Sequence, residues 1–409
     1  MRAGYLSEFF SGVAIKRLSA VEADLVRSHQ HEFNGDKGLI RVLGRTEVKR
    51  YFDALWVYLS DSDDEPIVAR CTLTWYDARV DRRPRTEHRF YFPTNPVSIV
   101  AAEGDLLVVA RRPDDSVLII IAQGGSTIAS QVQWLFGVAV QHKGFSVREE
   151  LETEQDRIQF ASAFILEQLG IDADAPAAAE NYLDAMLARF NGQLPPTAAF
   201  SAYARETLPD LDPMADPDGA LLGWMEREEI LFRTMEKHIL GDRLQKGFAD
   251  DVDGFLAFSL AVQNRRKSRS GRALENHLQV IFDANRIRYQ RGALTEAKQK
   301  PDFLFPGGKE YADLSFEATL LTMLGAKTTC KDRWRQVLAE AKRIDHKHLL
   351  TLEAAISVAQ TDQMKEYKLQ LVLPRGLHGT FTAPQQRELM TLANFTAMVK
   401  QREAASTTR

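Results

Sequence analysis

The sequence predicts a multidomain α+β protein, in which a β-rich domain precedes an α/β domain. Three observations predict this fold class. The 409 residues are enough to form two hydrophobic cores. Short apolar or alternating runs, separated by turn clusters, fill the first third of the chain. After residue 221, helical patterns are interspersed with short apolar strands, which is typical of an α/β domain.

The first domain is expected to be a β-barrel or sandwich, because its strands are short and closely spaced. The expected strands are 39–44, 54–60, 67–76, 88–93, 105–112 and 116–123. A helix at 129–138 ends this unit, and acidic helical segments follow at 161–170 and 179–190. Proline and aspartate discourage helix in 193–200 and 208–220. We therefore expect a domain over 1–170, a linker over 171–215 and a second domain over 216–405.

The second domain is expected to contain a sheet flanked by helices. The expected helices are 221–240, 252–267, 272–285, 332–344 and 385–401. The expected strands are 302–306, 324–330, 347–352 and 369–374. In the third helix, Leu274, Leu278 and Ile281 share one apolar face with His277 and Phe282.

The formal charge of −4 conceals an uneven distribution along the chain. Residues 1–145 balance 18 Lys and Arg against 18 Asp and Glu, whereas residues 146–260 hold 9 against 23. Residues 261–409 hold 25 against 15. A basic C-terminal third in an acidic chain favours a polyanionic partner such as nucleic acid. Chance clustering of solvated charges is the alternative.

The two cysteines, Cys71 and Cys330, are far apart in the sequence, which favours reduced thiols over a disulfide. We find no pattern of a secretory signal and no apolar run near the ~20 residues that span a bilayer. The expectation is a cytoplasmic protein with no membrane partner.

The segment KPDFLFPGG, residues 300–308, places Asp302 directly before an apolar strand. An acid there is either a turn residue or a ligand for a cation. Lys327 lies on the next expected strand, and Glu340 lies near the margin of the apolar face of the helix at 332–344. Two carboxylates that hold a divalent cation, with a lysine beside them, suit phosphodiester hydrolysis. The spacing alone leaves both interpretations open.

Four segments resemble the catalytic domain of the EcoRII restriction endonucleases: NRRKSRSGRALENHL (264–278), KPDFLFP (300–306), AKTTCKDRWRQVLAEAKRI (326–344) and ELMTL (388–392). The resemblance covers roughly residues 220–395. That family belongs to the PD-(D/E)XK nucleases, in the branch whose last acid lies on the helix after the lysine. Twelve residues separate Lys327 from Glu340, as that pattern requires. The resemblance implies that Asp302, Lys327 and Glu340 are catalytic, that Glu275 is an additional acid, and that Asp302 and Glu340 bind Mg²⁺.

The resemblance also implies which residues read DNA. Lys331, Asp332 and Arg333 correspond to the triplet that recognises paired C and G bases, and their chemistry fits. Arg and Lys donate to guanine O6 and N7, and a carboxylate accepts from cytosine N4. An ordinary charged helix start is the alternative. Arg269 and Arg272, beside Glu275, are expected to contact phosphates.

The N-terminal half is similar to the same family less closely. The segments IKRLSA (15–20) and SHQ (28–30) resemble the opening of its effector-binding domain, a β-barrel of the plant B3 type. This resemblance implies a second DNA site, with Lys16, Arg17 and His29 as contacts, although His29 also fits an ordinary surface histidine. A loop between two aromatic strands either grips phosphates or is a solvated hairpin tip. Its arginines are Arg79, Arg82, Arg83, Arg85 and Arg89.

The resemblance therefore implies a B3-like DNA-binding domain followed by an α/β PD-(D/E)XK catalytic domain. The implied activity is that of a Mg²⁺-dependent type II restriction endonuclease. It would cut double-stranded DNA at a CC/GG-flanked, CCWGG-like site as a homodimer, with a cognate cytosine methyltransferase in the same system. Two alternatives stay open, a modification-dependent endonuclease of the same fold and a catalytically inactive DNA-binding regulator.

Overall fold

The computed structural model divides into two compact units. Unit 1 comprises Met1–Asp174 and Ala355–Gln360, and unit 2 comprises Ala175–Ala354 and Thr361–Arg409. The structure describes residues 4–23, 31–61, 66–80, 85–141, 144–153, 162, 165–167, 169–171, 182–249, 251–330 and 334–407. In these residues, no helix is both long and apolar enough to cross a membrane.

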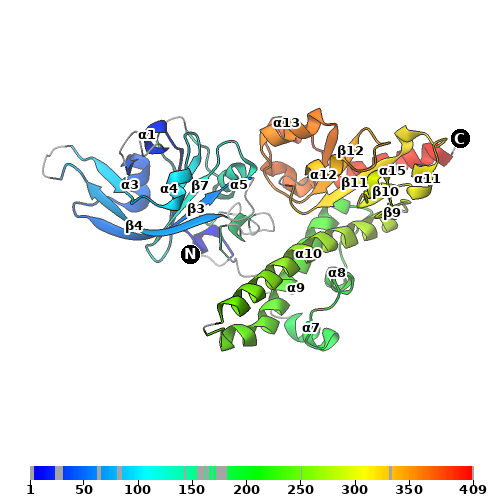
Figure 1. Ribbon diagram of the computed structural model, residues 1–409, viewed down its shortest axis with the longest axis horizontal. Helices are drawn as coiled ribbons and strands as arrows, with labels where there is room; N and C mark the ends of the chain where they lie inside the picture. Colours follow the sequence, from blue (N-terminus) through cyan, green and yellow to red (C-terminus); the bar gives the residue numbers. More distant parts are fainter. Residues whose placement is uncertain are drawn as a thin grey trace. The chain divides into compact units, whose positions relative to one another are not determined.

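Unit 1 is built on one eight-stranded sheet in the order β2-β5-β4-β3-β7-β6-β1-β8 (Figure 1). All neighbouring strands pair antiparallel except β3 and β7, which are parallel. The strands are β1 (Gly12–Arg17), β2 (Glu32–Gly35), β3 (Arg50–Leu59), β4 (Ile67–Asp77), β5 (His88–Tyr91), β6 (Leu106–Arg111), β7 (Val117–Ala122) and β8 (Ser146–Arg148). The β-rich first domain is thus confirmed as a curled sheet, a half-barrel in which β2 and β8 are the edge strands among the described residues.

Apolar side chains cover both faces of this sheet, which explains why β6 and β7 read as continuous apolar runs. On one face, Val108 and Ile120 pack with residues of α5 (Thr127–Phe136) and of the short helix η1 (Leu6–Glu8). On the other face, Val109 and Ile119 pack with residues of α3 (Lys37–Leu43) and α4 (Pro96–Val100). Helix α1 (Ala20–Ala23) also belongs to this unit.

The strand expected at 39–44 is wrong, because these residues form most of helix α3. The Asp36 carboxylate accepts from the Leu39 N–H at 2.9 Å and caps the helix N-terminus. Leu39, Val42 and Leu43 then face the core at helical spacing, and Gly44, with φ 85°, ends the helix. A short apolar run fits either structure until its cap is recognised. Strands β1, β2 and β8 were not among the expected strands.

Unit 2 begins with four helices: α7 (Leu183–Phe190), α8 (Thr197–Glu206), α9 (Pro217–Lys246) and α10 (Val252–Ala284). The first two lie inside the segment expected to be a linker. Met186 of α7 and Phe200 of α8 pack in one cluster with Phe232 of α9, so this part of 171–215 is a structural element. The two helices expected at 252–267 and 272–285 are a single helix, α10.

Unit 2 also contains a five-stranded sheet in the order β13-β12-β11-β10-β9. The strands are β9 (Gln290–Arg291), β10 (Phe303–Phe305), β11 (Thr322–Lys327), β12 (Lys347–Thr351) and β13 (Leu369–Val372). Strands β9, β10 and β11 are antiparallel, whereas β11, β12 and β13 are parallel. The Phe282 ring of α10 packs edge-on against Phe303 and Phe305, at centroid distances of 5.1 and 5.2 Å. This contact fixes β10, which Asp302 precedes, against the helical layer.

Shorter elements fill the connections of this half. They are η4 (Glu296–Lys298), α11 (Gly308–Ala312), η5 (Ala318–Leu320), α12 (Trp334–Leu338), α13 (Val358–Glu366), η7 (Arg375–Thr380), α14 (Ala383–Gln386) and α15 (Leu392–Thr407). Two expected helices differ from these bounds. The helix expected at 332–344 ends at Leu338, and the one expected at 385–401 is interrupted between α14 and α15.

Candidate active site

Asp302 and Lys327 meet because β10 and β11 are antiparallel neighbours. Phe303 pairs with Leu324, so Asp302 lies beside the end of β11. Its Oδ2 accepts from the Ala326 N–H at 2.7 Å and from Lys327 Nζ at 2.9 Å. In the described part of the chain, no hydrogen bond is made to Oδ1, which leaves that oxygen for a ligand. The side chains of Asp302 and Lys327 are 17% and 27% exposed, so the pair is accessible yet partly desolvated.

Glu340 completes the carboxylate pair. It follows α12 in a bend rather than standing on the helix itself. Burial, and then the negative charge of Asp302, raise the pKa of Glu340 to about 7, while Lys327 and Lys347 act in the opposite direction. The carboxylate oxygen Oε2 is buried, and no hydrogen-bond partner reaches it from the described residues. A buried oxygen of this kind can accept a hydrogen bond or bind a cation.

A polar network holds the chain directly after Glu340. Ala341 has φ 47°, an unfavourable value for a residue with a side chain. The Lys342 N–H donates to Glu296 Oε2 at 3.3 Å, and the Arg343 N–H donates to the Tyr311 hydroxyl at 3.3 Å. That hydroxyl itself donates to the Glu296 carboxylate, at 2.7 and 2.6 Å. Burial and this bond raise the pKa of Tyr311 to about 12, so the hydroxyl keeps its proton.

The guanidinium of Arg343 is the centre of this network. It donates to three backbone carbonyls, those of Tyr311, Asp313 and Phe316, the latter two at 3.0 and 2.8 Å. A fork with several donors fixes a loop in a way that a single ammonium does not. Arg343 therefore ties the turn that presents Glu340 to the loop after α11.

Glu275 lies on α10 and is bound by a different cation. Its carboxylate pairs with Arg291 of β9 at 2.6 Å, and the same guanidinium donates to Gln279 at 2.8 Å. Arg291 is the register partner of Phe303, which follows Asp302. Glu275 is thus joined through a neighbouring strand to the segment that carries Asp302, and its role as an additional acid stays a prediction.

The residues present fit a small divalent cation. In the described residues, no group of three or more His, Cys, Asp or Glu side chains converges as a metal cage. Asp302 Oδ1 and Glu340 Oε2 instead offer two carboxylate oxygens without protein donors. Mg²⁺ characteristically binds through one or two carboxylates and takes its remaining ligands from water and phosphate.

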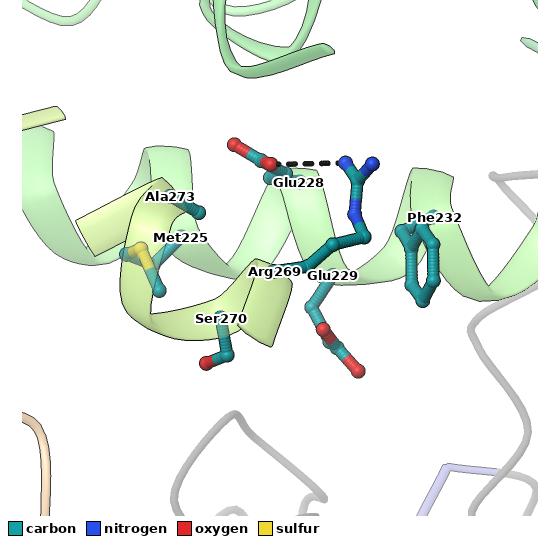
Figure 2. A pocket seen from close by; sticks show the side chains of 7 residues that line it. All are labelled: Met225, Glu228, Glu229, Phe232, Arg269, Ser270 and Ala273. Atoms are coloured by element: carbon teal, nitrogen blue, oxygen red, sulfur yellow. Dashed lines mark hydrogen bonds and ion pairs between the residues drawn. The ribbon is translucent and has the colours of Figure 1, made fainter. Parts of the chain in front are cut away.

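Arg269, predicted to contact phosphates, lies in the protein interior. It is 8% exposed, and its Nη2 donates to Glu228 at 3.2 Å across α9 and α10 (Figure 2). Its guanidinium also packs over the rings of Phe200 and Phe232, at 4.6 and 4.4 Å. The prediction is corrected here, because a guanidinium enclosed in this way presents no surface to DNA. Arg272, three residues later, is exposed.

Lys16 and Arg17 have unlike environments. Lys16 is 8% exposed, forms an ion pair with Glu22, and lies 4.7 Å from the centre of the Phe145 ring. This burial contradicts its prediction as a DNA contact. Arg17 is exposed and donates to the Gly104 carbonyl at 3.2 Å, so its guanidinium can still reach a phosphate. His29 lies outside the described residues.

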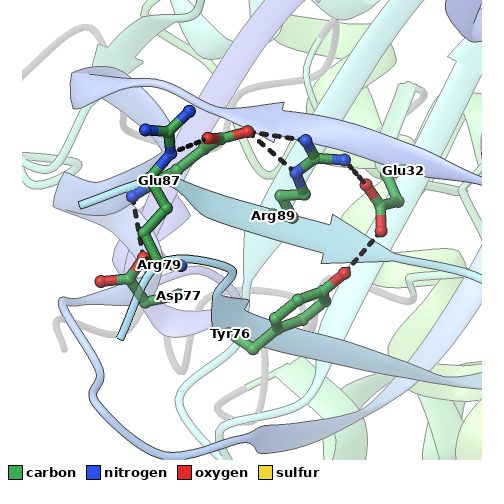
Figure 3. Close-up of polar contacts among 6 residues, drawn as sticks. All are labelled: Glu32, Tyr76, Asp77, Arg79, Glu87 and Arg89. Carbon is green, nitrogen blue, oxygen red and sulfur yellow. Dashed lines mark hydrogen bonds and ion pairs between the residues drawn. The ribbon is translucent and has the colours of Figure 1, made fainter. Parts of the chain in front are cut away.

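Arg89 stands between two carboxylates on the β2-β5-β4 edge of the unit 1 sheet. It donates to Glu32 and to Glu87, and Glu32 accepts from the Tyr76 hydroxyl at 2.5 Å (Figure 3). These carboxylates neutralise the arginine, so its use as a phosphate contact requires that they be displaced. In the same loop, Arg82 and Arg83 lie outside the described residues, as do Lys331, Asp332 and Arg333 of unit 2.

Sequence reasoning missed the residues that hold the site. Glu296, Tyr311 and Arg343 come from three separate segments, so no spacing reveals their network. Glu353, which follows β12 and is 4% exposed, was missed for the same reason. Its carboxylate accepts from the Cys330 N–H, at the end of the turn that follows Lys327. A single acid in a short apolar segment carries no sequence signal for that contact.

Part of unit 2 is similar to a known family. Residues 232–396 match the family model described as EcoRII C terminal. Asp302, Lys327, Glu340 and Glu275 all lie inside the matched segment. The sequence-based resemblance is therefore confirmed for this half of the chain.

The EcoRII match extends to a characterised enzyme. Over 201 residues, the chain is 45% identical to the type II restriction enzyme EcoRII of Escherichia coli. The aligned part is 49% of this chain and 48% of that enzyme, so the chain spans about half the length of the relative it matches.

Two solved restriction endonuclease complexes align with part of this chain at low identity and low TM-score. A PspGI complex with substrate DNA is 14% identical with a TM-score of 0.43, over 51% of this chain and 93% of that one. Metal-depleted Ecl18kI in complex with uncleaved, modified DNA is 17% identical with a TM-score of 0.42, over 56% of this chain and 85% of that one.

Proposed function

We propose that this chain is a Mg²⁺-dependent type II restriction endonuclease that cleaves double-stranded DNA at a CC/GG-flanked, CCWGG-like site. The observation that carries the proposal is the juxtaposition of Asp302, Lys327 and Glu340 within the segment that matches the EcoRII C-terminal family model. The relative that this chain matches is a type II restriction enzyme. Two carboxylates and one lysine at a sheet edge have the composition that phosphodiester hydrolysis requires.

Asp302 and Glu340 would hold the cation, since each has a carboxylate oxygen without a protein donor. A bound divalent cation polarises the phosphate and lowers the pKa of a coordinated water. Lys327 supplies the remaining positive charge. Its Nζ is fixed by Asp302 Oδ2, where it orients the attacking water and offsets the negative charge that develops on the phosphoryl oxygens.

The protonation of Glu340 sets the lower pH limit of this arrangement. With its pKa raised to about 7 in the metal-free chain, the carboxyl carries a proton below neutral pH. A cation then competes with that proton, because only the ionised carboxylate is a good ligand. Cleavage at low metal concentration should therefore decline as the pH falls below about 7.

The remaining parts of the proposal concern unit 1, recognition and assembly. Unit 1 would be a B3-like domain that binds a second DNA site and activates cleavage, with Arg17 at its surface. Lys331, Asp332 and Arg333 would read the C and G bases, as the donor and acceptor pattern of the major groove allows. A homodimer would match the twofold symmetry of the site. A cognate cytosine methyltransferase would protect the host DNA.

The first experiment is to incubate the purified protein with plasmid DNA and Mg²⁺ and to sequence the ends. Unmethylated and cytosine-methylated plasmids are tested in parallel, with an added oligonucleotide that carries the site as a possible activator. Discrete cuts at a CC/GG-type site on unmethylated DNA are expected. Cuts confined to methylated DNA would instead identify a modification-dependent enzyme. Tight binding without cleavage, with and without the activator, would identify an inactive DNA-binding regulator.

A further inference from the structure

Glu353 is a buried acid that the proposed chemistry does not use. It stands two residues after the end of β12 and is 4% exposed. Its carboxylate accepts from the backbone N–H of Cys330, which precedes it by 23 residues and is fully buried. Removing a carboxylate from water is costly unless hydrogen bonds compensate for the loss. The bond to Cys330 therefore makes Glu353 a fixed point of the interior rather than a surface charge.

Parallel pairing of β11 and β12 brings this acid to the end of β11. Lys327, the last residue of β11, is the register partner of Thr351, the last residue of β12. The Thr351 hydroxyl donates to the Thr328 carbonyl at 3.4 Å and accepts from the Glu353 N–H at 3.2 Å. Thr351 and Glu353 thus hold the two ends of the segment 328–330, which follows Lys327 directly.

A second buried residue stands on the far side of the residues proposed to read the bases. Trp334, the first residue of α12, is fully buried. Val337 of the same helix packs closely on β11, since a Cβ built on Gly325 would lie 2.9 Å from its Cγ2. Residues 331–333 are the whole of the chain between Cys330 and Trp334. Their position therefore depends on how firmly those two ends are held.

The two ends are held by different interactions. Trp334 is held by packing, which tolerates small displacements. Cys330 is held by a hydrogen bond, which fixes the direction of its N–H as well as its position. Lys327 has supports of its own, because its strand pairs with β12 and its Nζ lies 2.9 Å from Asp302. Loss of the Glu353 carboxylate should therefore release the Cys330 end and leave Lys327 in place.

We propose that Glu353 is a positioning residue for DNA recognition, which sets the place of residues 331–333 at the base edges by holding the Cys330 backbone. The inference rests on the proposed function and deepens it, since Glu353 acts through the backbone and not by contact with DNA. Hydrogen bonds to base edges depend on distance and angle, so a displaced reading residue loses discrimination between bases. The chemical step should suffer less, because Lys327 keeps its support.

The test compares the cleavage of two duplexes by the full chain in Mg²⁺. One duplex carries the CCWGG-like site, and in the other an outer C·G pair is replaced by T·A. We expect Glu353→Ala to lower the ratio of the two kcat/KM values by about tenfold or more. For the intact site, KM should rise while kcat changes by less than about threefold. Glu353→Gln keeps an oxygen that can accept from the Cys330 N–H, so it should recover most of the ratio.

Glu236→Ala is the matched control for a purely structural effect. Glu236 is a buried acid of the same unit, and it pairs with Arg266 at 2.7 Å on helices α9 and α10. Its loss should lower the free energy of unfolding but leave the ratio of kcat/KM values unchanged. An equal fall of the ratio in Glu236→Ala and Glu353→Ala would reject the positioning role.

Thr351→Val decides the matter if Glu353→Ala does not fold. It removes the hydroxyl that holds Thr328 and Glu353, so the ratio should fall in the same direction by a smaller factor. An unchanged ratio in folded Glu353→Ala, or in Thr351→Val where that variant is unfolded, would overturn the inference and leave the proposed cleavage intact.

Binding of the same two duplexes in EDTA, measured by fluorescence anisotropy, separates recognition from cleavage. A wild type that prefers the intact site but does not cut it in Mg²⁺ would refute the proposed cleavage. Loss of that preference in Glu353→Ala, but not in Glu236→Ala, would then still support the role of Glu353.

Discussion

Two of the clusters in unit 2 that combine carboxylates with cations hold a partly buried charge in opposite ways. At the sheet edge, Asp302 and Lys327 form one ion pair, and Glu340 beside them keeps a buried oxygen without a partner. Between the helices, Glu228 lies 3.2 Å from Arg269 and 2.9 Å from His277. We call the first cluster open, because the buried Glu340 oxygen has no partner among the described residues. We call the second closed, because its charged groups face one another.

In the closed cluster, each ionisable group faces another member of the cluster. Arg205 Nη1 lies 3.0 Å from His277 Nδ1, which makes that nitrogen the acceptor and leaves Nε2 to donate toward Glu228. Burial lowers the pKa of His277, consistent with a neutral ring. Trp224 stacks beside that ring at 5.7 Å. Glu228 therefore has Arg269 and His277 as its own counter-groups, and these contacts stabilise the packing of α9 on α10.

The comparison teaches that perturbed ionisable groups alone do not identify an active site. Burial shifts the pKa of both His277 and Glu340, but His277 Nε2 faces the Glu228 carboxylate at 2.9 Å, whereas Glu340 Oε2 has no such counter-group among the described residues. The lack of a counter-group within the protein, rather than the shift in pKa, separates a ligand site from a structural one. Substitutions in the two clusters should therefore have different consequences for stability and for activity.

The largest effect should come from the closed cluster. Glu228→Ala leaves Arg269 and Arg205 without their main counter-charge in the interior, and removal of one partner from a buried ion pair costs about 3–5 kcal/mol. Chemical denaturation should register that loss in the free energy of unfolding. Glu226→Ala, an exposed acid on the same helix, is the control. A loss below about 1 kcal/mol would show that the cluster is not structural.

A substitution in the open cluster should lower the rate of DNA cleavage rather than the free energy of unfolding. Asp302→Asn keeps the shape of the side chain but removes a charge proposed to hold the cation, and we expect cleavage to fall by about 10²–10³-fold. DNA binding in EDTA, measured by gel shift, should be retained. Asp313→Asn, an exposed acid that accepts from Ser315 at 2.6 Å, is the control. Loss of binding with residual cleavage would refute the role assigned to Asp302.

In the turn after Glu340, both kinds of arrangement meet. Hydrogen bonds among Glu296, Tyr311 and Arg343 hold the residues that follow the open carboxylate of Glu340. Arg343→Lys preserves the charge but loses the fork that holds three carbonyls. We expect Mn²⁺ binding, measured by electron paramagnetic resonance, to weaken by about 10–100-fold, as is usual when the support of a ligand is lost. Arg387→Lys, which alters an exposed arginine at the end of α14, should leave it unchanged. Equal Mn²⁺ affinity in both variants would mean that the anchor does not position Glu340.

Much of unit 2 could be predicted from its sequence because its signals are local. The strand after Asp302, the face of Leu274 and Leu278, and the interval from Lys327 to Glu340 each depend on a few neighbouring residues. The fate of Arg269 could not be predicted, because its partner Glu228 lies 41 residues away on another helix. Lys16 lies only six residues before Glu22, but its burial also depends on Phe145, which is distant in the sequence. The Asp36 cap that makes 39–43 a helix was not recognised.

The smallest expected effect is the dependence of stability on pH, in which the two clusters have opposite signs. The pKa of Glu340 is raised, so the folded chain holds its proton more tightly, and this stabilisation is present at low pH and lost as pH rises through about 7. Because Glu340 is partly exposed, we discount its contribution to about 1 kcal/mol. The pKa of His277 is lowered, so its contribution is present above the ordinary value of 6.5 and lost as pH falls below it. Unfolding in EDTA at pH 5 to 8 should show the advantage of Glu340→Gln over wild type growing with pH. For His277→Asn, the deficit relative to wild type should also grow with pH, because only the wild type gains stability there. If both differences stay constant across that range, burial does not distinguish the two sites in solution.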